Sequence, residues 1–152
     1  MNTTISLILF KIEENQFALH LESVERVIHA VFITELPKSP DVIIGVINLE
    51  GEIIPVVNLR KRFNIKSKDI HPNDQFIIAH TESRVVALVV DKVGDVIEKA
   101  TNEIISNNDV LPHLPFVNGL IATNDGLIVI NDIDNFLSLE EEIMLERALI
   151  NT

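Results

Sequence analysis

The side chains of this 152-residue chain that could do chemistry are its histidines, serines and carboxylates. There is no cysteine, which excludes disulfides and thiolate metal sites. The serines lack the glycine-flanked turn of a hydrolase nucleophile, and the five glycines are too widely spaced to cradle a phosphate. The histidines are scattered, and no two have the spacing of a metal site: His20, His29, His71, His80 and His113. We therefore expect no metal and no cofactor.

Asp91 is the one carboxylate whose position could suggest an enzyme. A double-barrel aspartic protease uses one catalytic Asp from each half of the chain. Here Lys92 and Val93 follow Asp91 in place of small residues, and the matching position in the first half is Glu22. We predict that the chain has no catalytic residues and is not an enzyme, which leaves a binding module.

The composition argues against nucleic acid as a partner and against a membrane-spanning segment. The net charge is −11 and the pI is near 4.7, whereas a nucleic-acid binder needs a basic face, and no Tyr or Trp is present to stack on bases. The basic run Arg60–Arg62 with Lys66 and Lys68 is expected to be a solvated loop after a strand. No signal peptide is recognisable, and no apolar run approaches the ~20 residues of a membrane helix. We expect a soluble, cytoplasmic protein that binds no nucleic acid.

Short runs rich in Ile and Val predict strands, and the clearest are in the segment 45–63. Two apolar stretches flank a polar corner, Asn48–Glu52, which contains Gly51 and predicts a tight hairpin. The segment that begins at Gly119 resembles the one that begins at Gly45, 74 residues earlier, with one extra turn residue expected before Gly126.

The chain contains a second internal similarity. Residues 18–28 resemble residues 87–97, which lie 69 positions later. Both halves therefore read as hairpin, short connection, hairpin, and such small all-β units usually close into barrels because closure removes exposed edges. We interpret residues 5–66 and 74–137 as two pseudo-repeats that form two similar barrels packed as one unit.

Helix is expected mainly at the C-terminus. Ser138 and Glu141 have the spacing of a capping box, and apolar residues follow at helical spacing, which predicts a helix over 138–150. A shorter helical turn is possible around Leu21–Ile28.

The run 45–63 closely resembles the signature of CheW-like chemotaxis coupling proteins, which reads roughly G-V-I-N-L-R-G-x-I-I-P-V-I-D-L-R-x-R-F. Further pieces match in the same order, so that the resemblance covers nearly the whole chain: 17–19, 24–28, 36–40, 89–93 and 127–137. It implies a mainly β fold of two intertwined SH3-like five-stranded β-barrels with a C-terminal helix, in a single CheW-like domain over 1–152.

The resemblance also implies a role and partners. Proteins of this family have no catalysis and bridge the cytoplasmic tip of methyl-accepting chemoreceptors to the regulatory domain of a CheA-type histidine kinase. Their contact with the membrane is therefore indirect, through the receptors. A receptor tip is a helical hairpin, and the resemblance implies that it binds in a groove between the barrels.

The positions that match family receptor contacts are Val24, Val27, Gly45, Val46 and Glu50. Glu50 stands where the pattern has Arg, and Arg26 stands where the family commonly has Glu. We predict that Arg26 and Glu50 form an ion pair with exchanged signs, which would tune the choice of partner. Plain core packing remains an alternative for Val24 and Val27, as does a simple turn role for Gly45.

The sequence is also compatible with two alternative functions. One keeps the fold but places it in another chemosensory-type pathway, for example surface motility. The other is a double barrel that binds a small molecule in the cleft between the barrels.

Overall fold

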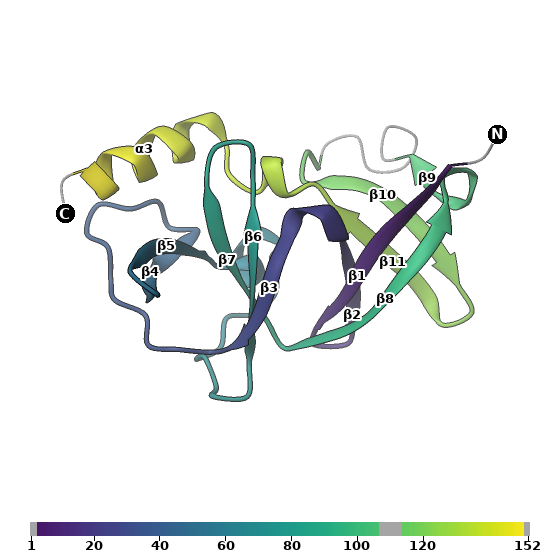
Figure 1. Ribbon diagram of the computed structural model, residues 1–152, viewed down its shortest axis with the longest axis horizontal. Coiled ribbons are helices and arrows are strands. Elements are labelled where there is room, and N and C mark those ends of the chain that lie inside the picture. The colour runs from purple at the N-terminus through teal and green to yellow at the C-terminus, as the bar shows by residue number, and fades with distance from the viewer. Residues whose placement is uncertain (1–2, 107–113, 151–152) are drawn as a thin grey trace.

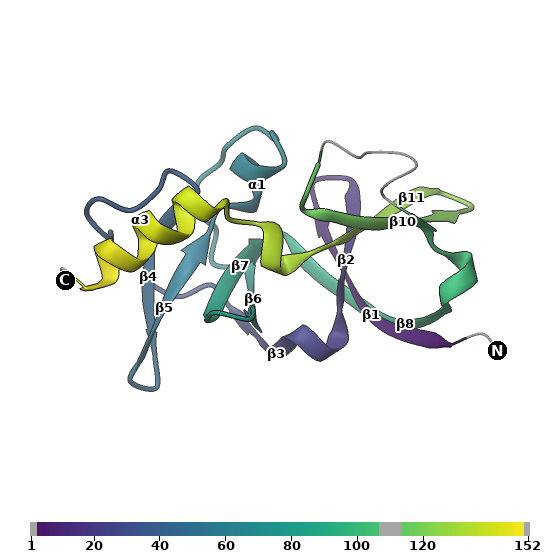
Figure 2. The ribbon, with the colours of Figure 1, turned by 90° about the horizontal axis from the view of Figure 1, so that it is seen from above.

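The computed structural model describes residues 3–106 and 114–150, so that His113 lies outside the described residues, and it contains two sheets and a C-terminal helix (Figures 1 and 2). One sheet has the strand order β8-β1-β2-β11-β10-β9, and the other has the order β3-β6-β7-β5-β4. The strands of the first are β1 (Thr4–Ile12), β2 (Asn15–His20), β8 (Lys92–Ala100), β9 (Ile105–Ser106), β10 (Val117–Thr123) and β11 (Gly126–Asn131). Those of the second are β3 (Val24–His29), β4 (Ile43–Leu49), β5 (Glu52–Val57), β6 (Gln75–His80) and β7 (Val85–Val90).

Each sheet takes strands from both halves of the sequence. The hairpin β1–β2 joins β8 to β11 from the second half, while β6–β7 joins β3 to β5 from the first half. The exchanged hairpins attach through parallel pairs, in which Ala18 lies opposite Ile130 and Ala87 opposite Val56. The two pairs are equivalent, because Ala87 lies 69 positions after Ala18 and Ile130 lies 74 positions after Val56.

Each sheet also encloses its own apolar cluster, and the two clusters use equivalent positions. The cluster of the first sheet is Leu7, Ala18, Ile121, Ile128 and Ile130. The cluster of the second is Ile47, Ile54, Val56, Phe76, Ile78 and Ala87. We call the two units barrel A and barrel B, and the predicted fold of two intertwined barrels is confirmed. Barrel A has the two-residue β9 in addition to the five strands expected.

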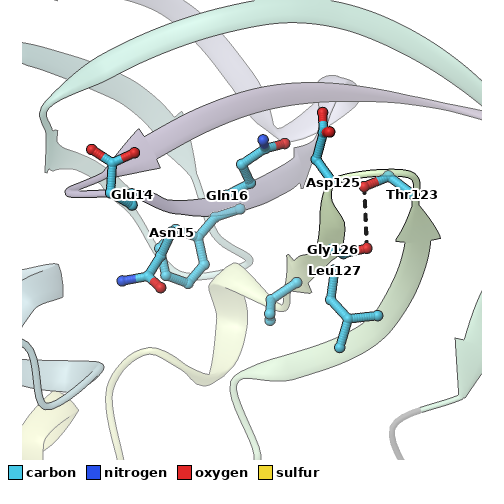
Figure 3. A pocket seen from close by; sticks show the side chains of 9 residues that line it. Glu14, Asn15, Gln16, Thr123, Asp125, Gly126 and Leu127 are labelled. Atoms are coloured by element: carbon cyan, nitrogen blue, oxygen red, sulfur yellow. Dashed lines mark hydrogen bonds between the residues drawn. The ribbon is translucent and has the colours of Figure 1, made fainter.

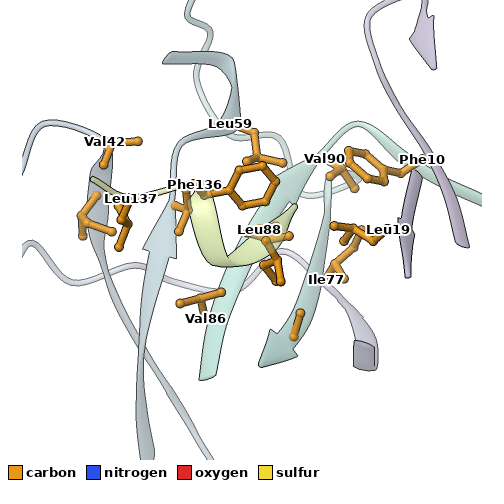
Figure 4. Close-up of a cluster of buried hydrophobic side chains, with 14 of the residues drawn as sticks. Phe10, Leu19, Val42, Leu59, Ile77, Val86, Leu88, Val90, Phe136 and Leu137 are labelled. Atoms are coloured by element: carbon orange, nitrogen blue, oxygen red, sulfur yellow. The ribbon is translucent and has the colours of Figure 1, made fainter. Parts of the chain in front are cut away.

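A third and larger cluster lies between the barrels and includes residues of the C-terminal helix. Part of it is drawn in Figure 4. Its aromatic centre is Phe17, which stacks on Phe63 with ring centroids 4.6 Å apart and on Phe10 at 5.5 Å. Leu145 and Ala148 of the helix are buried in the same cluster. Removal of this apolar surface from water holds the barrels and the helix together.

The helical segments are α1 (Leu59–Arg62), α3 (Leu139–Ile150) and the 3-10 turns η1 (Leu21–Ser23), η2 (Thr101–Glu103) and η3 (Ile133–Asn135). The predicted capping box is confirmed, since Ser138 Oγ accepts from the Glu141 N–H at 3.1 Å and Glu141 Oε1 accepts from the Ser138 N–H at 2.8 Å. The helical turn considered around Leu21–Ile28 is limited to η1. Val24–His29 is a strand instead, because its β-branched residues pair with β6.

The expectation of an extra turn residue before Gly126 is wrong. Leu49 lies opposite Glu52 and Thr123 opposite Gly126, so each hairpin has a two-residue loop. The spacing between glycines differs because Gly51 lies within its loop whereas Gly126 follows its loop.

The expectation of a solvated basic run is also wrong for two of its residues. Arg60 is only 8% exposed, and Arg62 is half-buried. Arg62 Nη2 donates to both carboxylate oxygens of Glu141 at 2.6 and 2.7 Å, which ties α1 to the start of α3. Both arginines are shielded from solvent because they pair with carboxylates from distant parts of the chain: Glu13 and Asp91 for Arg60, and Glu141 for Arg62.

Candidate partner-binding site

The predicted pair of Arg26 and Glu50 is present in the structure. Arg26 Nη2 lies 3.5 Å from Glu50 Oε2, with side-chain exposures of 43% and 78%. The pair joins β3, at one edge of barrel B, to the loop between β4 and β5 at the other edge. Because both groups face water, the pair contributes at most ~1 kcal/mol to stability, and its charges remain available to a partner.

Backbone geometry places both residues. Glu50 and Gly51 have φ of 54° and 90°, the pattern of a type I′ turn, whose twist matches that of a hairpin. Asn48 Oδ1 accepts from the Gly51 N–H at 2.9 Å and fixes the corner. Arg26 follows an irregularity in the pairing of β3 with β6, and such bulges re-aim side chains.

The other predicted contact positions differ in accessibility. Val24 and Val27 are half-buried and pack against the central cluster, so that each has one side in the core. Val46 is buried, and it exchanges two backbone hydrogen bonds of 2.8 Å with Thr34. A Cβ on Gly45 would lie 2.2 Å from the Thr34 carbonyl oxygen, so Gly45 is required for this close approach and is not a turn residue.

Sequence reasoning missed an ion network where the barrels meet. Arg60 Nη1 donates to Glu13 Oε1 at 2.6 Å, and Arg60 Nη2 donates to both oxygens of Asp91 at 2.9 Å. The backbone N–H of Glu13 donates to Asp91 Oδ2 at 2.7 Å. The network links the β1–β2 turn of barrel A, α1 of barrel B and the residue between β7 and β8. The sequence signal that could have pointed to Arg60 was its place in the family signature, where Asn58-Leu59-Arg60 matches D-L-R.

The network fixes the charge states of its members. Burial alone would raise the pKa of Asp91, but the Glu13 N–H and the Arg60 guanidinium outweigh burial and hold that pKa below its ordinary value. Burial likewise opposes the charge of Arg60, and hydrogen bonds to Glu13 and Asp91 raise its pKa all the same. Asp91 thus holds together a structural ion network, which accounts for its burial without a protease role.

Two other findings bear on the class of site. Among residues 3–106 and 114–150, no group of three or more His, Asp or Glu side chains is arranged to hold a metal ion. None of the helices in this part of the chain is long and apolar enough to cross a membrane.

Comparison with known proteins assigns the family. The model of the CheW-like domain family matches residues 6–141. The chain belongs to the CheW-like domain family. A chemotaxis protein CheW of Thermotoga maritima is 36% identical over 140 residues, which are 92% of this chain and 90% of that protein. A chemotaxis protein CheW of Rhizobium meliloti is 28% identical over 137 residues, covering 89% and 88% of the two chains.

Solved structures agree with this assignment. The scaffolding protein TtCheW from Thermoanaerobacter tengcongensis superposes with a TM-score of 0.82 at 31% identity, over 91% of this chain and 96% of that one. This CheW-like chain therefore has the SH3-like double-barrel fold of a chemotaxis scaffold protein. The groove between the barrels and its receptor contacts remain predictions.

Proposed function

We propose that this CheW-like protein is a non-catalytic, cytoplasmic adaptor that couples chemoreceptor cytoplasmic tips to a CheA-type histidine kinase. The family match across residues 6–141 carries the proposal, and the whole chain would act as one domain. A rigid double barrel suits this task because an adaptor must hold two partners at a fixed separation.

The receptor face would be formed by β3 and the β4–β5 loop of barrel B. Val24 and Val27 would supply apolar contact, and Arg26 and Glu50 would select the partner by charge. Gly45 and Val46 are buried, so their contribution would be to hold β4 in place.

The first experiment is a pull-down of the purified protein with a receptor cytoplasmic tip and, separately, with a CheA regulatory domain. Binding to both is expected. Binding to neither would contradict the adaptor function, and binding to the kinase domain alone would contradict the receptor role.

A charge-exchange series then tests the receptor face. Glu50→Arg places two cations together and should weaken receptor binding about tenfold, whereas the combined Arg26→Glu and Glu50→Arg exchange restores the pair with the signs common in the family. Asn124→Arg, in the equivalent loop of barrel A, is the matched control and should leave binding unchanged. Equal binding by all of these variants would contradict the assignment of this face.

A further inference from the structure

The outward face of barrel B is covered by a helix from the chain itself. Arg84, immediately before β7, contacts α3 through Glu146, with Nη2 to Oε2 at 2.8 Å, and through Glu142, with Nε to Oε2 at 3.5 Å. Val86 of β7 is buried in the same cluster as Leu145 of α3. Both ribbon views show α3 running across this side of barrel B (Figures 1 and 2).

The equivalent face of barrel A is a hollow of about 350 Å³ (Figure 3). It lies across the parallel pair β2 and β11, which matches the pair β7 and β5 of barrel B, and Val57 of β5 shares the buried cluster of Leu145 as well. Asn15 and Phe17 line it at the positions that match Arg84 and Val86 in barrel B. Phe17 is itself covered by Phe63, so the open part of the face that α3 covers on barrel B is here the end formed by Asn15, Asp125 and Leu127.

The surface of this hollow indicates what it would accept. Leu127, on β11, leaves 56% of its surface exposed, although it is a large apolar side chain. Glu14 lies at one end and Asp125 at the other, and neither carboxylate has an ion-pair partner among the described residues (Figure 3). An amphipathic helix with Lys or Arg beside its apolar face would complement both features.

The charges also disfavour α3 of a second copy as the occupant. That helix has Glu140, Glu141 and Glu142 in its first turn and Glu146 further on. These residues would meet Glu14 and Asp125, and Asn15 offers no cation in place of Arg84. Two chains of net charge −11 would repel each other in addition.

We propose that this face of barrel A docks an amphipathic helix with basic flanks from a partner protein, in the way that the matching face of barrel B docks α3. The site consists of Glu14, Asn15, Phe17, Asp125 and Leu127 and is separate from the Arg26–Glu50 pair on barrel B.

Two peptides test the proposal by titration while backbone amide NMR signals are followed. One has the sequence of α3, residues 139–150, and the other has Lys in place of Glu140, Glu141, Glu142 and Glu146. The Lys peptide should shift amide signals of residues 14–17 and 123–129, and it should bind at least tenfold more tightly than the α3 peptide. Leu127→Asn should weaken it several-fold. Val96→Asn, at an exposed apolar residue of β8, is the matched control and should have no effect.

Charge reversal gives the decisive comparison. In the Glu14→Lys and Asp125→Lys double variant the α3 peptide should become the tighter ligand, and Asn15→Arg alone should improve its binding by recreating the Arg84 contact. Absence of binding by the Lys peptide, signal shifts away from the hollow, or a preference unchanged by reversal would each overturn the proposal. So would self-association of the unmodified protein that Leu127→Asn abolishes, because the occupant would then be a second copy.

Discussion

Barrels A and B have equivalent strands and interiors but differ in the side chains at their junctions with the rest of the molecule. In barrel B, Arg60 is the second residue of α1 and binds Glu13 of the other barrel. The equivalent residue after β11 is Asp134, which accepts a hydrogen bond from the backbone N–H of Glu82 at 2.8 Å. The same two positions therefore meet in both halves, once as a buried ion network and once as a surface hydrogen bond.

The hairpin loops show the same kind of difference. Arg26 and Glu50 pair across barrel B, whereas the matching positions of barrel A are Asp95 and Asn124, which cannot form an ion pair. The repeated apolar positions specify the barrel, and the charged positions that are not repeated give each barrel its own contacts. Partner choice in this chain would thus depend on a few surface charges on a shared scaffold.

The largest expected effect is the difference in unfolding free energy between a variant of Arg60 and a variant of the equivalent residue, Asp134. Arg60→Met removes the cation from the network and leaves Asp91 partly buried without its partner, which should cost about 3–5 kcal/mol of unfolding free energy. Asp134→Asn keeps a side-chain oxygen for the Glu82 N–H and should cost less than about 0.5 kcal/mol. Urea denaturation measures both. Similar losses in the two variants would contradict the view that only the barrel B junction depends on buried charge.

The matching strand glycines Gly45 and Gly119 give the next contrast. A methyl group at Gly45 would lie 2.2 Å from a backbone oxygen, whereas at Gly119 the nearest atom is the side-chain Cγ2 of Ile104 at 2.7 Å and the nearest backbone oxygen, that of Ile105, is 3.0 Å away. Gly45→Ala should therefore cost about 2–3 kcal/mol, and Gly119→Ala about 1 kcal/mol, since a side chain can move where backbone cannot. Thermal unfolding of both variants tests this order, which a larger loss for Gly119→Ala would reverse.

Acid should weaken the α1 region of barrel B. Burial alone would raise the pKa of Glu141, but hydrogen bonds from Ser138 and Arg62 lower it, and the pKa of Asp91 is lowered by its own network. A carboxyl with a lowered folded pKa stabilises the protein above its ordinary pKa of about 4, and this stability is lost as the pH falls through the folded value. The urea concentration at the unfolding midpoint should therefore decrease as the pH is lowered below about 4. Glu141→Gln should make this decrease with pH less steep. An identical acid slope in that variant would exclude Glu141 as a source.

The parts of the structure predictable from sequence are those that repeat. The positions of Ala18 and Ala87, and the glycines that begin the matching hairpins, indicated two barrels because strand patterns and turns are local. The burial of Arg60 was not predictable by local reasoning, since its partners Glu13 and Asp91 are distant in sequence and a charge run is usually exposed. The Arg26–Glu50 pair was predictable only through the family pattern, which related two residues that local reasoning keeps apart.

The smallest effect concerns the loop of barrel B. Glu50 has a positive φ of 54°, which a type I′ turn requires and which Asn tolerates better than Glu. Glu50→Asn should therefore raise the unfolding free energy by about 0.5 kcal/mol despite loss of the ion pair, while Glu50→Gln loses the pair without this gain. Receptor binding should weaken equally in both variants, because it depends on the charge. Equal stability of the two variants would show that the backbone at Glu50 carries no cost, and unequal binding would show that the shape of the loop contributes to recognition as well as its charge.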